Sequence, residues 1–329
     1  MTIVLGIEST AHTFGVSIVK KGKILSNIKK SYTTEQGGII PIEAANHHKE
    51  NKNTIFLESL KKAGIKIRDV DAIAFSQGPG LAPCLLEGMK FAKKLAADLK
   101  KSIVPVNHCI AHLEIGKITG ARDPVMLYTS GANTQIIAYS SGKYRIFGET
   151  LDIGVGNFID NFARYIGMGF PGGPKIQKLA EKSKNYIELP YKVKGMDITL
   201  SGILTNLKQK LNSDKSKLSD LAYSMQETVF AMLVETAERA LAHTGKNELL
   251  LGGGVACNSR LQEMCRIMCE ERGAKFFCPP NNLLTDNGAM IAFLGEIMYE
   301  KGIKISYKEL DKIDIKPRQR TDEVDIIYR

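Results

Sequence analysis

Two well-separated stretches of this sequence repeat one pattern, an apolar strand, a small polar turn and a second strand. The first copy is LGIESTAHTFGVSIVKKGKI, which begins at Leu5, and the second is MLYTSGANTQIIAYSSGKYRI, which begins at Met126. In both, a Gly-Lys turn and a third strand complete the unit. A duplicated unit of this kind predicts two similar lobes with a ligand cleft between them.

The rest of the chain alternates strands and helices, which is typical of an α/β protein. Predicted strands cover residues 71–80, 102–108 and 247–254, with another from about Lys275. Predicted helices cover residues 54–65, 85–101 and 221–245, with others from about Asn258 and from Asp286. The expected division is a first lobe of residues 1–122 and a second of residues 123–329, with the last helix returning to the first lobe.

The segment PVNHCIAHLE, residues 105–114, carries two histidines four residues apart. Residues at i and i+4 share one face of a helix, so His108 and His112 can bind one metal ion, although two surface histidines give the same spacing. Asp286 is a suitable third ligand because a carboxylate complements two imidazoles, but it could instead cap the last helix. Cys109 follows His108, so the HExxH motif of zinc proteases is missing.

Two glycine-rich stretches mark places where the backbone can approach a ligand closely. LLLGGGVACN lies between a strand and a helix, and it matches neither GxGxxG nor GxxxxGK[ST], which disfavours a Rossmann or P-loop site. DIGVGNFIDNFARYIGMGFPGGPK predicts a loop that closes over a ligand. Asp160 and Arg164 in this stretch could alternatively form a surface ion pair.

Composition limits the class of protein. The chain of 329 residues is 43% hydrophobic, enough for a large core, yet it has no apolar run that could span a bilayer and its N-terminus does not resemble a signal peptide. Six cysteines without a CxxC pair indicate a reduced, cytoplasmic protein. The net charge of +10 favours a phosphate-bearing partner such as nucleic acid, although a lysine-rich surface of a heat-adapted organism would look the same.

Together these motifs resemble the TsaD-like family of tRNA N6-adenosine threonylcarbamoyltransferases, in its archaeal and eukaryotic branch. The resemblance covers nearly the whole chain and rests on GIESTAHTFGVSIV, QGPGLAPCLLEGMKFAK, NHCIAHLE, YTSGANTQ, GNFIDNFARYIG, PGGPKI, LLLGGGVACN and TDNGAMIA. It implies an ASKHA fold, the two-lobed architecture of actin and sugar kinases. The implied reaction moves a threonylcarbamoyl group from threonylcarbamoyl-AMP to N6 of the adenosine beside the anticodon, position 37, in tRNAs that read ANN codons.

The resemblance also implies site residues. One divalent metal per subunit, iron or zinc, would be held by His108, His112, Tyr128 and Asp286. The adenine nucleotide would contact Tyr128, Thr129, Ser130, Gly131, Ala132, Asp160, Gly173, Gln177 and Asn258. Two positions depart from the family pattern, because Ala132 replaces a glycine and Gln177 replaces a glutamate, and no general base is evident.

Partners follow from the same resemblance. They are tRNA and the subunits of the KEOPS complex, including a small dimerising subunit and a kinase-like protein that in some archaeal relatives is fused after this point of the chain. No membrane association is expected. Two alternatives remain open: a metallopeptidase, the family's former label, and a non-catalytic nucleotide-binding scaffold.

Overall fold

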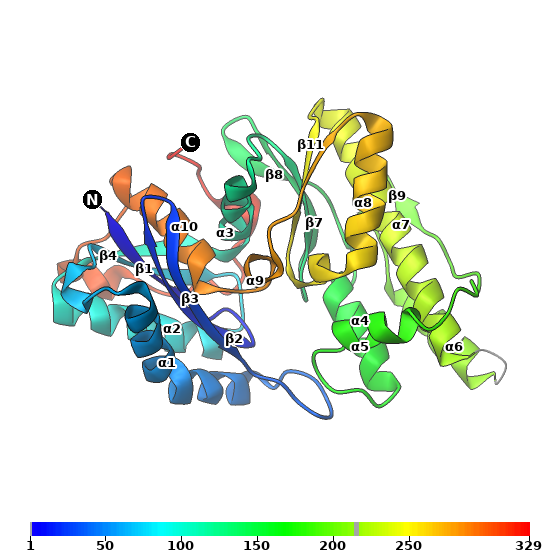
Figure 1. Cartoon of the computed structure of the whole chain (residues 1–329), viewed down its shortest axis with the longest axis horizontal. Coiled ribbons are helices and arrows are strands. Elements are labelled where there is room, and N and C mark those ends of the chain that lie inside the picture. Colours follow the sequence, from blue (N-terminus) through cyan, green and yellow to red (C-terminus); the bar gives the residue numbers. More distant parts are fainter. Residues whose placement is uncertain (1, 214–216) are drawn as a thin grey trace. The chain divides into compact units, whose positions relative to one another are not determined.

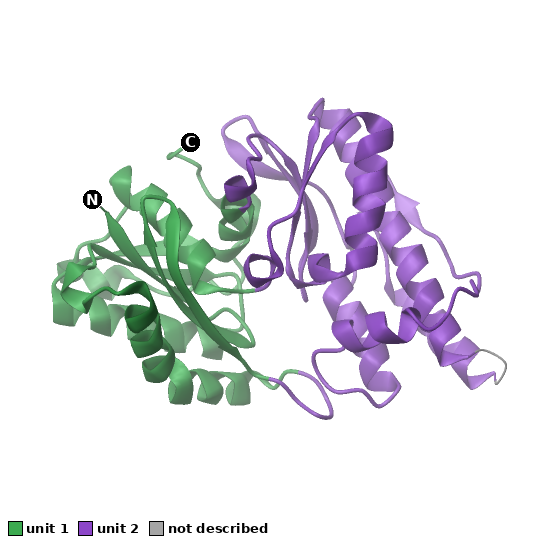
Figure 2. Cartoon of the chain, in the orientation of Figure 1, with its two compact units in different colours: residues 1–32, 39–115, 286–329 green, residues 33–38, 116–285 purple. Residues whose placement is uncertain are grey.

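The computed structural model describes residues 2–213 and 217–329, which form two compact units (Figures 1 and 2). Unit 1 contains residues 1–32, 39–115 and 286–329, and unit 2 contains residues 33–38 and 116–285. Unit 1 therefore includes the last helix, α10 (Gly288–Glu300), and the chain that follows it. Within the described residues, no helix combines the length and the apolar character that a membrane span requires.

Unit 1 is built on a five-stranded sheet with the order β3-β2-β1-β4-β5. Its strands are β1 (Ile3–Glu8), β2 (Thr13–Lys20), β3 (Lys23–Ser31), β4 (Ala72–Gly78) and β5 (Ser102–Asn107). The first three strands are antiparallel, and β4 and β5 continue the sheet in parallel with β1. Its helical segments are α1 (Pro41–Ala63), η1 (Ile67–Asp69), α2 (Ala82–Leu99), α3 (His108–Ile115), α10, η4 (Tyr307–Lys312) and η5 (Thr321–Glu323).

The alternation of side chains along β1 gives each face of this sheet its own helices. Leu5 and Ile7 point into a core that includes Phe91 of α2. Gly6 points the other way, where a Cβ would overlap the backbone of Ala292 in α10. The absent side chain of Gly6 therefore lets α10 lie directly on the sheet.

Unit 2 repeats the same topology, with the order β12-β11-β6-β7-β8. Its sheet consists of β6 (Val125–Thr129), β7 (Thr134–Ser140), β8 (Lys143–Glu149), β11 (Glu248–Gly252) and β12 (Lys275–Phe277). Again three antiparallel strands are followed by two parallel ones. The hairpin turns also match, because Lys21–Gly22 and Ser141–Gly142 all have positive φ. The predicted repeat is confirmed.

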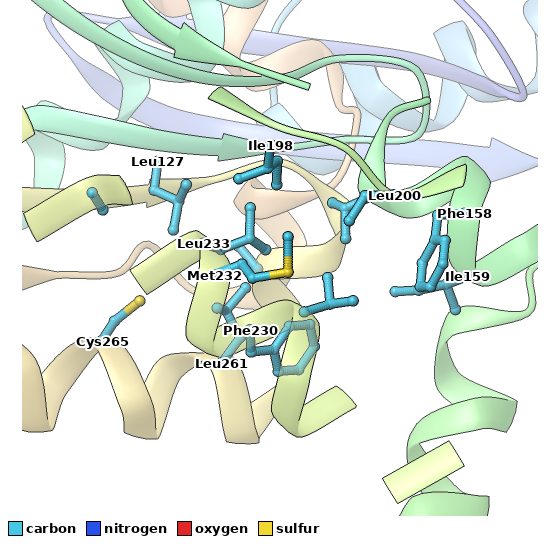
Figure 3. Close-up of a cluster of buried hydrophobic side chains, with 14 of the residues drawn as sticks. Leu127, Phe158, Ile159, Ile198, Leu200, Phe230, Met232, Leu233, Leu261 and Cys265 are labelled. Atoms are coloured by element: carbon cyan, nitrogen blue, oxygen red, sulfur yellow. The ribbon is translucent and has the colours of Figure 1, made fainter. Parts of the chain in front are cut away.

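The helices of unit 2 enclose its core. They are η2 (Gly116–Thr119), α4 (Val155–Tyr165), α5 (Gly173–Ala180), α6 (Ser201–Asn212), α7 (Leu218–Thr244), η3 (Gly254–Cys257), α8 (Ser259–Arg272) and α9 (Asn281–Leu284), with a small hairpin of β9 (Val193–Lys194) and β10 (Asp197–Ile198). Figure 3 shows Met232 and Leu233 of α7 among side chains of β6, α4 and α8. The long apolar helix predicted from the sequence is thus the centre of this core.

The predicted α/β class is confirmed, but two predicted elements differ from the structure. Helix α1 begins at Pro41, well before the predicted residues 54–65. The sequence pattern does not predict this start because few of the first residues are buried and most of them are polar. The glycine-rich stretch is not a loop throughout. Residues 155–165 and 173–180 form α4 and α5, and the irregular parts are residues 152–154 and the glycine-rich connection between the two helices.

Candidate functional site

The two histidines of the segment PVNHCIAHLE lie on α3, directly after β5. Asn107 Oδ1 accepts a hydrogen bond from Ile110 N over 3.1 Å and so caps the first turn of this helix. His108 and His112 are buried, with 6% and 2% of their surface exposed, so they are not ordinary surface histidines. Their ring centroids lie 4.7 Å apart, edge to face, and the predicted shared face is confirmed.

The side chain of Asp286 contacts both histidines in unit 1. Its Oδ1 lies 3.4 Å from Nε2 of His108 and 3.4 Å from Nε2 of His112. It does not cap α10, because Asn287 occupies the cap and its Oδ1 accepts from Met290 N over 3.1 Å. The carboxylate of Asp286 is therefore directed at the imidazoles, and the capping alternative is wrong.

The three side chains have the geometry of a metal site. Each offers one ligand atom, and these atoms lie within 4.8 Å of one another. Ligands at about 2.0–2.1 Å from a tetrahedral zinc ion are about 3.3 Å apart, close to the separation of each histidine from Asp286. Two imidazoles and one carboxylate also match the three-ligand sets of catalytic zinc and non-haem iron. His108, His112 and Asp286 thus fit the metal that the resemblance implies.

Ionisation within this group follows from its charges. Burial disfavours a charged His108, but Glu8 and Asp286 outweigh it and raise the pKa of His108 well above its usual value. Burial and the neighbouring His108 lower the pKa of His112. Burial alone would raise the pKa of Asp286, but hydrogen bonds from the two histidines hold that pKa well below its usual value. A metal cation would replace the proton on His108 as the positive charge of the group.

Glu8 is the site residue that the sequence analysis missed. It ends β1 and is fully buried, and its Oε2 lies 3.0 Å from Nδ1 of His108. Its other oxygen accepts hydrogen bonds from the N–H and the hydroxyl of Thr10. A carboxylate inside an apolar strand was the available signal, since such a group is rarely buried without a partner.

In unit 2, the loop of residues 129–132, for which the resemblance implies contact with the nucleotide, is held by close backbone contacts. Ser130 O and Gly131 O accept hydrogen bonds from Gly156 N and Asn157 N, at 3.1 and 2.9 Å, in the first turn of α4. On its other side, Gly253 has φ +89°, and a Cβ there would overlap Thr129 O. The glycines of both motifs therefore let α4 and the β11–η3 turn approach this loop.

The remaining residues that are predicted to bind the nucleotide lie on α4, on α5 and at the start of α8 in unit 2. Asp160 Oδ1 accepts from Gly172 N over 2.7 Å, which holds the start of α5 against α4. Gln177 on α5 donates to Ser259 Oγ over 3.0 Å, and so lies beside Asn258 at the start of α8. Gly173 has open space where its Cβ would be. The structure thus connects α4 to the start of α5 through Asp160, and connects α5 to the start of α8 through Gln177.

Asn258 and Arg164 each have hydrogen-bond partners within unit 2. Asn258 caps α8, accepting from Arg260 N over 2.9 Å, and its amide donates to Gln226 Oε1 over 2.8 Å. Arg164 donates to Asn161, whereas Asp160 contacts Gly172, so no Asp160–Arg164 ion pair is needed to explain either side chain.

Tyr128 is placed differently from the other predicted metal ligands. It lies on β6 in unit 2 and is fully buried, whereas His108, His112 and Asp286 belong to unit 1. Its role as a fourth ligand stays a prediction.

Comparison with known proteins identifies relatives over the whole chain. A family model described as tRNA N6-adenosine threonylcarbamoyltransferase matches residues 23–293. Proteins of that name from Thermococcus kodakarensis and Thermococcus gammatolerans are 55% and 56% identical, with 99% of this chain and 99% of each relative covered. A probable bifunctional tRNA threonylcarbamoyladenosine biosynthesis protein from Methanosarcina acetivorans is 50% identical over 99% of this chain, which spans 60% of that protein. These names support transfer chemistry and give no support to a peptidase.

Solved structures support the fold. Full-length HypF in its phosphate- and nucleotide-bound form aligns with a TM-score of 0.63 at 13% identity, covering 92% of this chain and 56% of that one. Component A of (R)-2-hydroxyglutaryl-CoA dehydratase from Acidaminococcus fermentans aligns with a TM-score of 0.54 at 15% identity, covering 95% and 100%. The expected ASKHA fold is confirmed.

Proposed function

Because the chain belongs to the tRNA N6-adenosine threonylcarbamoyltransferase family, we propose that it transfers threonylcarbamoyl from threonylcarbamoyl-AMP to N6 of adenosine 37 in tRNAs that read ANN codons. The observation that carries this proposal is the end-to-end identity of 55% with a transferase of that name. The reaction forms the bond from N6 to the carbamoyl carbon and breaks the bond from that carbon to the phosphate oxygen. AMP leaves with the electron pair, and N6 loses a proton.

We assign His108, His112 and Asp286 as the ligands of the metal ion. When bound, a divalent iron or zinc ion supplies Lewis-acid stabilisation of negative charge on a carbonyl or phosphate oxygen. The support is the compact triangle of ligand atoms described above. Asp286 balances the positive charge of the ion, and burial of both histidines limits exchange of the ligands with water.

We assign the binding site of the adenine nucleotide to residues of unit 2. The loop of Thr129–Ala132 would hold the phosphate through its backbone, and Asp160 and Gly173 would hold the ribose. Support comes from the close packing of this loop against the start of α4. Gln177 lacks the charge of the family's glutamate, so it would bind a hydroxyl more weakly.

We also assign tRNA and KEOPS subunits as partners, among them a kinase-like protein and a small dimerising subunit. The Methanosarcina acetivorans relative is longer than this chain and is named as a bifunctional protein of tRNA threonylcarbamoyladenosine biosynthesis, which supports a partner in the same process. The cysteine pattern supports a cytoplasmic location.

Mass analysis of nucleosides from tRNA tests the transfer. The protein is incubated with threonylcarbamoyl-AMP and unmodified tRNA, with and without KEOPS partners from a related archaeon. We expect threonylcarbamoyladenosine with the wild type and none with His112→Ala. His243→Ala is the matched control, because His243 contacts Phe147 edge-on in unit 2 and is not one of the proposed site residues. Absence of the product in every wild-type reaction contradicts the proposal.

A further inference from the structure

Glu8 is a buried carboxylate whose two oxygens have different partners. Oε1 accepts from Thr10 N over 2.7 Å and from Thr10 Oγ1 over 2.5 Å, whereas Oε2 lies 3.0 Å from His108 Nδ1. The rest of β1 is apolar, and Glu8 has no measurable exposure to solvent. One oxygen therefore anchors the carboxylate to its own turn, and the other is left for His108.

The internal repeat shows that the fold does not need a carboxylate here. Glu8 immediately precedes Ser9 at the end of β1, and Thr129 immediately precedes Ser130 at the same place in unit 2. Thr129 is also buried and satisfies its hydroxyl locally, by donating to Gly252 O over 3.2 Å. A neutral threonine occupies the equivalent position at the end of β6 in unit 2. The presence of a carboxylate at Glu8 is therefore explained by a contact that only unit 1 contains.

The turn that carries Glu8 is rigidly placed. Thr10 O accepts from Leu81 N over 2.7 Å, and a Cβ on Gly80 would overlap this carbonyl. A Cβ on Gly88 in α2 would likewise overlap Ser9 Oγ. These contacts hold Ser9 and Thr10 in place, and Thr10 in turn holds the carboxylate of Glu8. A carboxylate held in one position can fix the orientation of a neighbouring imidazole.

We propose that Glu8 is a positioning residue that keeps the hydrogen of His108 on Nδ1 and presents Nε2 to the metal, an inference that rests on the proposed metal-dependent function. Nδ1–H donates to Glu8, so the lone pair for the metal is on Nε2, the nitrogen that faces Asp286 at 3.4 Å. Carboxylates commonly orient metal-binding histidines in this way. His112 has Nε2 at the same distance from Asp286, so both imidazoles present the same nitrogen.

Zinc affinity tests the proposal. The full chain is titrated with Zn²⁺ in competition with a chromophoric chelator, as wild type, Glu8→Ala and Glu8→Gln. We expect about 10–100-fold weaker binding for Glu8→Ala, the usual effect of removing such a partner. Glu8→Gln should lie between the two, because its amide oxygen can still accept from Nδ1–H but carries no charge.

Glu296→Gln is the matched control. Glu296 is another buried carboxylate of unit 1, and it accepts hydrogen bonds from Lys21 N and Gly22 N at the hairpin turn and not from a metal ligand. Its substitution should leave zinc affinity unchanged. An equal loss of affinity in Glu296→Gln and Glu8→Gln would overturn the positioning role, since both effects would then reflect general loosening of unit 1.

A spectroscopic measurement separates positioning from simple structural support. In the zinc-loaded protein with ¹⁵N-labelled histidine, the Nδ1–H of His108 should exchange slowly with water. Its signal is assigned by its nuclear Overhauser contact with Thr10, whose Oγ1 lies 3.3 Å from His108 Nδ1. Glu8→Ala should make this proton exchange fast while other histidine signals stay unchanged. If Glu8→Ala does not fold, zinc affinity and proton exchange are both measured on Glu8→Gln.

The outcomes distinguish this inference from the metal site itself. If His108→Ala loses zinc while folded Glu8 variants keep wild-type affinity and a slowly exchanging proton, the role of Glu8 is overturned and the metal site stands. If His108→Ala keeps zinc, the assignment of the metal to His108 is wrong, and the proposed role of Glu8 is overturned as well.

Discussion

Asn107 Nδ2 donates a hydrogen bond to Gln319 Oε1 over 3.1 Å, which connects the start of α3 to the C-terminal segment of unit 1. The same Asn107 caps α3 through its Oδ1. The C-terminal segment is itself attached to the sheet, because Lys316 N donates to Gln77 O over 2.8 Å. The residues after α10 therefore support the helix that carries both histidines.

This connection predicts graded effects on unit 1. Asn107→Ala removes both the helix cap and the hydrogen bond to Gln319, so it should lower the free energy of unfolding by about 1.5–2.5 kcal/mol. Gln319→Ala leaves the cap in place and should cost about 0.5–1.5 kcal/mol, the usual net value of one hydrogen bond, with a smaller loss of zinc affinity than Asn107→Ala. Urea unfolding and zinc competition measure the two effects. Greater zinc loss in Gln319→Ala would show that the cap is not what holds α3.

Removing a metal ligand should abolish stoichiometric metal. His108→Ala or Asp286→Ala leaves two of the three described ligands, which hold an ion poorly, so both metal content and transfer should be lost. Elemental analysis of the purified variants measures the content, with His243→Ala as the control. Full occupancy in either ligand variant would remove that residue from the site.

The cluster of His108, His112 and Asp286 could be predicted from the sequence because two of its members are local. The i, i+4 spacing places His108 and His112 on one face of any helix, and ligand chemistry then selects a carboxylate. Glu8 could not be found in this way, because its partner His108 lies 100 residues further along the chain and only the folded sheet brings them together. Likewise, the start of α1 was missed because its early residues are largely exposed, so the sequence there has no apolar period to detect.

Nucleotide binding should depend on Asp160. Asp160→Ala removes the acceptor proposed for the ribose and also releases Gly172 N, so affinity for an ATP analogue should fall by about 1–3 kcal/mol. Isothermal titration calorimetry measures it. Asn161→Ala is the matched control on the same helix, since Asn161 contacts Arg164 on α4. Unchanged affinity in Asp160→Ala would exclude it from the ribose site.

The buried His48 should make unit 1 sensitive to acid. Burial lowers the pKa of His48 to about 4, and its Nε2 lies 2.9 Å from Ala11 O, a contact that the neutral ring makes as a donor. The unfolded chain binds a proton below about pH 6.5, whereas the native ring stays neutral until about pH 4. Stability should therefore fall as pH drops through this window, by at most about 3 kcal/mol from this group.

The variant His48→Gln keeps a donor for Ala11 O but does not titrate. It should be less stable than the wild type at pH 7 and should lose less stability between pH 7 and pH 4.5. Urea unfolding of both proteins at the two pH values measures the difference, and the other titratable groups are the same residues in both proteins. The same pH dependence in the two proteins would contradict a neutral, buried His48.

Binding of tRNA by the isolated chain should be weak and dominated by phosphate contacts. The net charge of +10 attracts the backbone of any tRNA, but scattered lysines read phosphates and not bases. Affinity should fall steeply with salt, because less free energy is gained from releasing condensed counterions. Filter binding at low and moderate salt, with a tRNA that reads ANN codons and one that does not, measures both properties. Tight and selective binding that salt does not weaken would show that this chain recognises its tRNA without partner subunits.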